Sequence, residues 1–223
     1  MDTGSADIRQ RLRALPALAG PFPPVDFSCA PASPQDLFLD WLDAAIHAGI
    51  REPHAMTLCT VDEAGCPDAR VLILKSVDER GWHFASSGHS PKGRQIQAQP
   101  AVALNFYWKE LGRQVRIRGV ARPLDGTESA QDFLARSLDA RAGVLLAKQS
   151  APLESPAEVG PAISAARKRL EADTGLIAPS WHVYAVAPSI VEFWQGAGDR
   201  LHQRLCYQRD DGESPWRRQL LWP

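Results

Sequence analysis

The chain has 223 residues, of which 44% are hydrophobic and 23% are charged, and its formal net charge is −1. This length is enough to bury one substantial core, and the balanced charge argues against a nucleic-acid-binding protein, which usually needs a strongly basic domain. No long apolar segment follows Met1, so we expect neither a signal peptide nor a membrane anchor. The four cysteines are far apart and form no CxxC pair, which argues against a zinc site or a disulfide framework and favours a cytoplasmic protein.

The first segment, residues 1–32, is rich in proline, alanine and glycine. The sequence PFPP at 21–24 excludes a regular helix or a central strand there. We interpret residues 1–32 as a partly irregular N-terminal arm that lies over the surface, with a short helix around Leu12 and Leu15. Residues 33–223 are expected to form a single domain.

A helix is predicted to begin at Ser33. The Ser33 hydroxyl can cap the helix, and Pro34 suits its first position. Apolar side chains such as Phe38 and Trp41 then recur on one face, and Gly49 is a plausible end.

The rest of the chain predicts many short strands and few helices, with turn signals such as Asp211-Gly212 between them. The predicted strands are residues 56–61, 70–75, 82–85, 101–108, 114–118, 181–187, 190–194, 205–209 and 216–221. The predicted helices are residues 90–99, 127–136 and 140–148, and one that starts at a capping box at Ser155 and runs to about Ala172. These elements predict a mainly β, α+β fold, an antiparallel barrel with peripheral helices.

Cationic and amide side chains gather at the ends of the predicted strands and at turns. A phosphate group needs several N–H donors, from arginine, lysine or a helix N-terminus, and Lys92 near a predicted helix start meets that need. The other candidates are Arg70, Lys75, Gln114, Arg116, Arg136, Gln149, Ser150, Trp194, Arg200, His202 and Arg204. One phosphate would not require so many cations, so two phosphorylated ligands account for them better.

Each candidate also has a simpler explanation when it is taken singly. Most arginines and lysines are solvated surface charges, and a tryptophan such as Trp194 is more often a core or interface residue. The histidines show no spacing that would hold a metal, so no metal site is expected. The glycines form neither a GxGxxG nor a P-loop pattern, which leaves a Rossmann-type nucleotide site without support.

Four parts of the chain resemble the pyridoxamine 5'-phosphate oxidase family, and the resemblance runs from about Ser33 to Pro223. The most specific part is EFWQG at 192–196 followed by RLHQR at 200–204. The other segments are EPHAMTL at 52–58, RVLILK at 70–75 and GRQVR at 112–116. The resemblance implies that residues 33–223 form an FMN-binding split barrel that includes a C-terminal dimerisation segment. It also implies a homodimer, with FMN held between the two subunits.

The resemblance also implies a role for each candidate residue. The implied FMN-binding residues, some of them supplied by the partner chain, are Arg70, Val71, Leu72, Ile73, Leu74, Lys75, Ala85, Ser86, Lys92, Gln114, Gln149, Ser150, Trp194 and Arg204. Lys75 and Arg136 would hold the substrate phosphate, and Arg200 and His202 would lie against the pyridine ring as the catalytic residues. The implied reaction oxidises pyridoxamine or pyridoxine 5'-phosphate to pyridoxal 5'-phosphate and reduces O2 to H2O2.

Two departures from the family pattern keep other readings open. Asp132 and Ala140 stand where the family usually has a tyrosine and a serine that help to bind the substrate phosphate. An aspartate there repels a phosphate unless its side chain points away. One alternative is therefore a related FMN oxidase that acts on another aromatic metabolite, as in phenazine-tailoring relatives. Another is a barrel that binds flavin or a small ligand without turnover.

Overall fold

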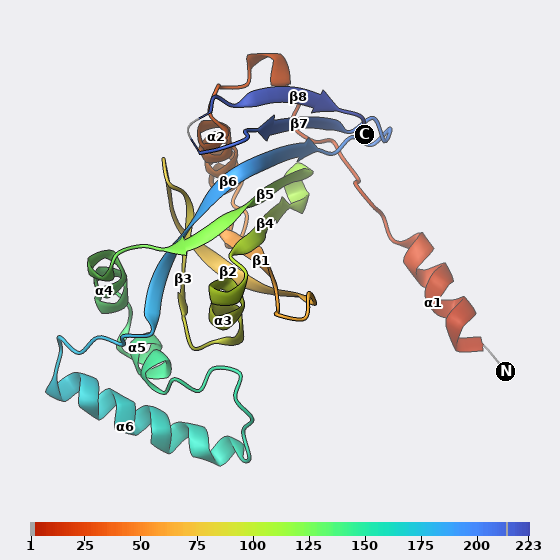
Figure 1. Ribbon diagram of the computed structural model, residues 1–223. Coiled ribbons are helices and arrows are strands. Elements are labelled where there is room, and N and C mark those ends of the chain that lie inside the picture. Colours follow the sequence, from red (N-terminus) through yellow and green to blue (C-terminus); the bar gives the residue numbers. More distant parts are fainter. Residues whose placement is uncertain (1–2, 213) are drawn as a thin grey trace.

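The computed structural model describes residues 3–212 and 214–223. Its strands make one antiparallel sheet in the order β3-β2-β1-β4-β5-β6-β7-β8, which an additional pairing of β3 with β6 closes into a barrel. The strands are β1 (Ala55–Val61), β2 (Pro67–Asp78), β3 (Gly81–Ser87), β4 (Ala101–Trp108), β5 (Arg113–Pro123), β6 (Trp181–Gln195), β7 (Gln203–Gln208) and β8 (Arg217–Leu221). The predicted split barrel with peripheral helices is therefore confirmed, with β7 and β8 extending the sheet beyond the closed part (Figure 1).

The helices decorate this barrel at its ends and sides (Figure 1). They are α1 (Thr3–Ala14), α2 (Pro34–His47), α3 (Pro91–Ala98), α4 (Gly126–Leu134), α5 (Leu138–Leu145) and α6 (Val159–Ala172), with short 3-10 turns at Phe27–Cys29, Lys109–Leu111 and Pro156–Glu158. In the described part of the chain, no helix is both long enough and apolar enough to cross a membrane.

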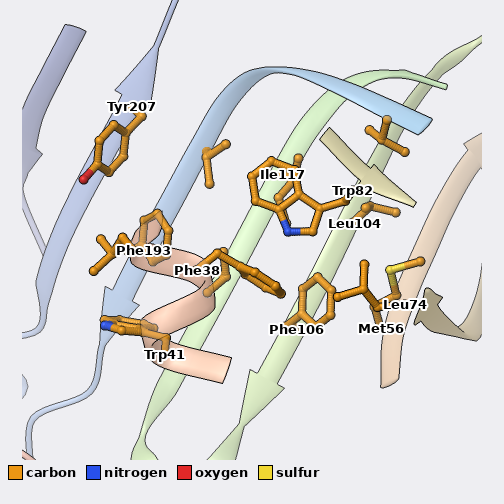
Figure 2. Close-up of a cluster of buried hydrophobic side chains, with 14 of the residues drawn as sticks. Phe38, Trp41, Met56, Leu74, Trp82, Leu104, Phe106, Ile117, Phe193 and Tyr207 are labelled. Carbon is orange, nitrogen blue, oxygen red and sulfur yellow. The ribbon is translucent and has the colours of Figure 1, made fainter. Parts of the chain in front are cut away.

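Helix α2 supplies the aromatic side chains that fill one end of the barrel. As predicted, the Ser33 hydroxyl accepts hydrogen bonds from the first turn, and Gly49 follows the helix end with a φ of +70°. Phe38 is completely buried, with its ring 4.8 Å from Phe106 and 5.5 Å from Trp82 between ring centroids (Figure 2). Burial of these large rings is a main source of the barrel's stability, because hydrophobic stabilisation scales with the apolar area removed from water.

Strand β6 corrects one prediction. Residues 181–187 and 190–194 are expected as two strands, yet they belong to one continuous strand of 15 residues. This strand includes Pro188, although a proline lacks the backbone donor that a central strand uses. The register of β5 against β6 shifts between Arg118 and Gly119, and Gly119 pairs with Pro188. A Cβ on Gly119 would lie 2.2 Å from the carbonyl oxygen of Ala187. The irregularity and the missing side chain therefore accommodate the proline, and β6 spans the whole length of the barrel.

Two helix boundaries also differ from the predictions. The capping box at Ser155 forms, but it begins the 3-10 turn, and α6 starts only at Val159. The helix expected over 140–148 is α5, which begins at Leu138 behind a Ser137 cap and ends at Leu145.

The N-terminal arm lies only partly over the surface. Helix α1 extends away from the barrel (Figure 1), whereas Phe27 is buried against it. Tyr207 donates a hydrogen bond to the carbonyl of Pro31 at 2.7 Å. A Cβ on Gly112 would lie 2.9 Å from the ring of Phe22, so the arm also passes over the start of β5.

Candidate active site

A cavity of about 820 Å³ lies along the outer face of β2 and β3 and beneath the segment that joins α5 to α6. Several of the predicted site residues line it. We call these residues the cavity group: Val71, Leu72, Ile73, Lys75, Ala85, Ser86, Lys92, Arg136 and Gln149. The strand pairing of β3 with both β2 and β6 brings them together, so closure of the barrel creates this half of the site.

Lys92 is a buried cation at the start of α3. Its side chain follows the Ser90 cap, and its ammonium lies 3.3 Å from the Ser90 hydroxyl. Burial is the main cause that lowers the pKa of Lys92, and the nearby positive charge of Arg70 lowers it further. The charge of Asp68 opposes this shift. A Cβ on Gly93 would lie 2.4 Å from the carbonyl of Ser87, so only glycine lets the helix start pack this closely on the strand turn. A desolvated ammonium beside a helix N-terminus is suited to bind an anion.

Arg136 is a second cation of the cavity group; it is half-buried and follows the end of α4. Its guanidinium stacks over Trp181 at 4.2 Å from the ring centroid, and its Nε is buried with no hydrogen-bond partner among the described residues. Burial lowers the pKa of Arg136, while Asp132 opposes this shift. A buried donor without a partner is unfavourable, so Arg136 is also arranged to receive a ligand.

Lys75 and Asp132 form an ion pair at the same wall, with Nζ 3.0 Å from Oδ1. The other oxygen of Asp132 accepts a hydrogen bond from the indole N–H of Trp181 at 2.8 Å. Asp132 therefore does not point away from the predicted phosphate lysine, as a phosphate site would require, but binds it. Ala140 lines the cavity, so the position expected to carry a serine offers no hydroxyl.

Two members of the RVLILK segment do not line the cavity with their side chains. Leu74 points into the core and is 8% exposed (Figure 2). The guanidinium of Arg70 donates to Thr60 and Gln95 and pairs with Asp68, on the side of β2 that faces α3. Arg70 thus contributes its charge near Lys92 rather than a direct contact with the cavity.

The remaining predicted residues lie elsewhere. Ser150 follows Gln149 with a φ of +66° and does not line the cavity. We call the other five the far-end group, because they cluster around the opposite end of β6: Gln114, Trp194, Arg200, His202 and Arg204. Trp181 and Trp194 stand near the two ends of β6, which correspond to roughly 40 Å of extended strand. One chain therefore does not bring the two groups into one site.

The far-end group is organised by hydrogen bonds between strands. Trp194 pairs with Gln114 on one side and with Arg204 on the other, and its ring lies 4.8 Å from that of His202. The Nδ1 atom of His202 accepts a hydrogen bond from the backbone N–H of Ala197 at 3.1 Å, and its Nε2 has no hydrogen-bond partner among the described residues. Arg200 has a φ of +70° in the turn before β7.

Glu192 fixes Arg204 within this group. The Nε atom of Arg204 donates to Oε1 of Glu192 at 2.9 Å, and its NH1 donates to the carbonyl of Trp222. The second oxygen of Glu192 accepts from Arg116, and Glu192 itself is 7% exposed. Arg204 is therefore positioned before any ligand arrives.

The sequence analysis missed several side chains that line the cavity, above all Trp181, Ser87 and Lys148. A tryptophan at a strand start gives no sequence signal for such a role, because its contacts with Asp132 and Arg136 exist only once β6 runs beside α4.

Comparisons with known proteins agree with this fold. Residues 42–169 match the family described as pyridoxamine 5'-phosphate oxidase, and residues 181–223 match the pyridoxine 5'-phosphate oxidase C-terminal dimerisation region. The barrel and its cation-lined cavity thus define a protein of the split-barrel oxidase class. The chain belongs to the pyridoxamine 5'-phosphate oxidase family, which confirms the resemblance in the sequence and identifies the chain as an oxidoreductase.

Individual relatives carry the same family description. A pyridoxine/pyridoxamine 5'-phosphate oxidase from Rhodopseudomonas palustris is 40% identical over 200 residues, covering 90% of this chain and 94% of the relative. One from Thermosynechococcus vestitus is 42% identical over 199 residues, covering 88% and 92%.

Solved structures share the fold. PhzG from Burkholderia lata, in complex with tetrahydrophenazine-1-carboxylic acid, superposes with a TM-score of 0.83 at 30% identity, over 92% of this chain and all of that one. A pyridoxamine 5'-phosphate oxidase-related, FMN binding protein from Nostoc punctiforme superposes with a TM-score of 0.67 at 19% identity, over 86% and 98%.

Proposed function

We propose that this chain is an FMN-dependent oxidase that converts pyridoxamine or pyridoxine 5'-phosphate to pyridoxal 5'-phosphate, and that it acts as a homodimer with FMN between its subunits. The observation that carries the proposal is the cavity of about 820 Å³, which is lined by the buried Lys92 and by the half-buried Arg136, neither with a carboxylate hydrogen bond among the described residues. Its family membership and the names of its relatives support the choice of substrate.

The residues present fit a phosphorylated flavin. Lys92 and the start of α3 would hold the phosphate, with Arg70 adding charge behind them. Val71 and Ile73, which are 66% and 37% exposed, provide an apolar surface on β2 against which a flat ring would pack. When bound, FMN would supply the acceptor for a hydride from the substrate and the route by which the electrons reach O2 to give H2O2.

The chain's own residues would hold and orient the substrate. Arg136 would bind the substrate phosphate through its unpartnered Nε, with Lys75 beside it. His202 and Arg200 would pack against the pyridine ring, with the Nε2 of His202 available for a hydrogen bond. Two fixed phosphates would align the substrate with the flavin, and such alignment is a large part of catalysis.

A homodimer would bring the far-end group of one chain to the cavity group of the other. The C-terminal segment 181–223 matches a dimerisation region, and it carries most of the far-end group. Large apolar side chains are exposed near both groups, namely Val71 at 66%, Leu201 at 69% and Trp222 at 91%. Exposed apolar side chains of this size are typical of an interface.

The decisive experiment is a visible absorption spectrum of the purified protein before and after anaerobic addition of pyridoxine 5'-phosphate. We expect a flavin spectrum that bleaches on addition of the substrate and returns with O2, together with one H2O2 for each turnover. A flavin band that stays unchanged with both B6 phosphates would refute the proposed substrate, and a protein that does not take up FMN would refute the oxidase itself.

A second candidate is an FMN oxidase for another aromatic metabolite. The Lys75–Asp132 ion pair and Ala140 favour it, because they remove phosphate ligands from the cavity wall. The superposition on PhzG bound to an aromatic carboxylic acid points the same way. In the same experiment, bleaching by a reduced phenazine carboxylic acid but not by B6 phosphates would select this candidate. A flavin that no substrate bleaches would instead indicate a binding barrel without turnover.

A further inference from the structure

At one wall of the cavity, a carboxylate already forms an ion pair with a cation. Lys75 lies on the outer face of β2, and its ammonium is 3.0 Å from Oδ1 of Asp132. The Lys75 side chain is 35% exposed and lines the cavity, whereas that of Asp132 is 17% exposed and lies behind it. A ligand that reaches Lys75 from the cavity therefore meets a lysine whose charge is already compensated.

Asp132 is held in place independently of Lys75. Its second oxygen accepts a hydrogen bond from the indole N–H of Trp181 at 2.8 Å, and Trp181 is only 8% exposed. If the carboxylate rotated away, the Trp181 donor would lose its partner, which is unfavourable for a buried group. Lys75, in contrast, has a flexible stem and three donors, so it can turn toward a ligand while Asp132 stays.

Arg136 completes the local charge balance. It lies four residues after Asp132 and stacks on the same Trp181 ring at 4.2 Å. The wall thus has two cations and one carboxylate around a single indole. A doubly charged phosphate would be attracted by Arg136 and Lys75 but repelled by Asp132, because like charges a few ångströms apart in a partly desolvated site interact strongly.

We propose that Asp132 competes with the substrate phosphate for Lys75 and thereby sets how strongly the cavity prefers phosphorylated over unphosphorylated ring substrates. This inference rests on the proposed function, since it assumes that the ring substrate binds in the cavity with its phosphate at Lys75 and Arg136. An unphosphorylated ring makes no demand on Lys75, so Asp132 leaves its binding unchanged.

The test is the Asp132→Asn substitution, which removes the charge and keeps an oxygen that can accept the Trp181 N–H. Calorimetric titration of the FMN-loaded protein with 4-deoxypyridoxine 5'-phosphate and with 4-deoxypyridoxine measures phosphate preference without turnover, because neither ligand has the hydroxyl that is oxidised. We expect about tenfold tighter binding of the phosphorylated ligand, as expected from removing one nearby like charge. The affinity for the unphosphorylated ligand should change less than about twofold, since it places no charge near this wall.

Glu128→Gln is the matched control, because Glu128 is an acid on the same helix that pairs with Arg80 and does not line the cavity. It should leave both affinities unchanged. If Asp132→Asn does not fold, Asp132→Ser removes the same charge with a smaller side chain and should give the same preference.

Equal gains for both ligands, no gain for either, or the same gain in Glu128→Gln would overturn the competition at Lys75. These results would leave the oxidase proposal intact if the wild type still oxidises pyridoxine 5'-phosphate. Conversely, a tenfold gain in phosphate preference in a protein that oxidises neither B6 phosphate would support the competition and refute the proposed reaction. Failure of the phosphorylated ligand to bind either the wild type or Asp132→Asn would overturn both.

Discussion

The cavity group and the far-end group hold their cations in opposite ways. In the cavity group, Lys92 is buried and Arg136 is half-buried, and neither has a carboxylate hydrogen bond among the described residues. Burial lowers the pKa of each. In the far-end group, Arg204 donates to the buried carboxylate of Glu192 and to a C-terminal carbonyl. The cations of the first group gain stability when an anion binds. The charge of Arg204 in the second group is already neutralised by Glu192, which fixes the direction of its side chain.

The two groups also depend on different parts of the fold. The cavity group requires the closed barrel, because β3 must pair with both β2 and β6 to bring Ala85 and Ser86 beside the RVLILK strand. The far-end group requires the β6–β7 pairing and the chain terminus. Lys75 is the exception in the cavity group, since Asp132 already compensates it. The cavity group is therefore suited to bind ligand charge, and the far-end group is suited to hold a fixed geometry.

The largest expected effect is on the activity of dimers in which one chain has a defect in the cavity group and the other chain has a defect in the far-end group. Lys92→Ala and Arg204→Ala should each weaken FMN binding by about 10- to 100-fold, since each removes a charge-assisted contact. When the two variants are co-expressed, a mixed dimer has one site with both defects and one intact site. Random pairing should then restore about a quarter of the wild-type activity, because half the dimers are mixed and each has one of two sites intact. Peroxide production by the co-expressed pair measures this.

The control for this experiment combines two variants from the cavity group. Co-expression of Lys92→Ala with Arg136→Ala leaves every site with one defect, so no activity should return. If the first pair also fails to complement while both variants fold and dimerise, the two groups do not belong to one shared site.

A smaller effect is expected at Glu192. Glu192→Gln removes the buried charge that holds Arg204 and Arg116 but keeps an acceptor oxygen. Because Arg204 would lose its fixed direction, FMN should bind roughly fivefold more weakly, within the range of a lost charge-assisted hydrogen bond. Fluorescence titration with FMN measures the change, and Glu192→Asp, which keeps the charge at a shorter reach, should recover part of it. Unchanged affinity in Glu192→Gln would mean that Arg204 needs no positioning.

Much of the fold could be predicted because it depends on local signals. The Ser33 cap, the Gly49 end and the alternation around Gln114 each act within a few residues, and the corresponding elements formed. Residues 181–195 could not be predicted as one strand, since the pairing of Pro188 with Gly119 joins positions far apart in the sequence. Burial of Phe38 among rings from β3 and β4 is similarly a consequence of closure.

The candidate site was predictable to a lesser extent. Family motifs pointed to the residue types, and the structure gathers part of them around one cavity. The direction of each side chain was not predictable: Arg70 turns toward Thr60, and Asp132 turns toward Lys75 and Trp181. These orientations depend on which neighbours are left without partners, and only the packed structure determines that.

The smallest expected effect concerns the β3–β6 seam, which carries Ala85 and Ser86 of the cavity group and none of the far-end group. His83 on β3 is 3% exposed, and burial is the main cause that lowers its pKa, with Asp78 opposing and Arg80 adding to the shift. The pKa of His182, which pairs with Ser86 across the seam, is also lowered, mainly by burial and secondly by the charge of His89. A base with a lowered folded-state pKa is stable when neutral, so stability is complete above the unfolded value near 6.5 and falls as the pH decreases below it.

His83 alone can contribute a slope of at most about 1.4 kcal/mol per pH unit, the value for one extra proton bound by the unfolded chain. Thermal unfolding between pH 7.5 and 5 should therefore show a falling midpoint in the wild type and a flatter profile in His83→Gln. Hydrogen exchange should show that amides of β3 lose protection at acidic pH before those of β7, because only the seam must take up these protons. An equal loss in both strands would show that the two halves of the site unfold together, and that the cavity group has no separate acid sensitivity.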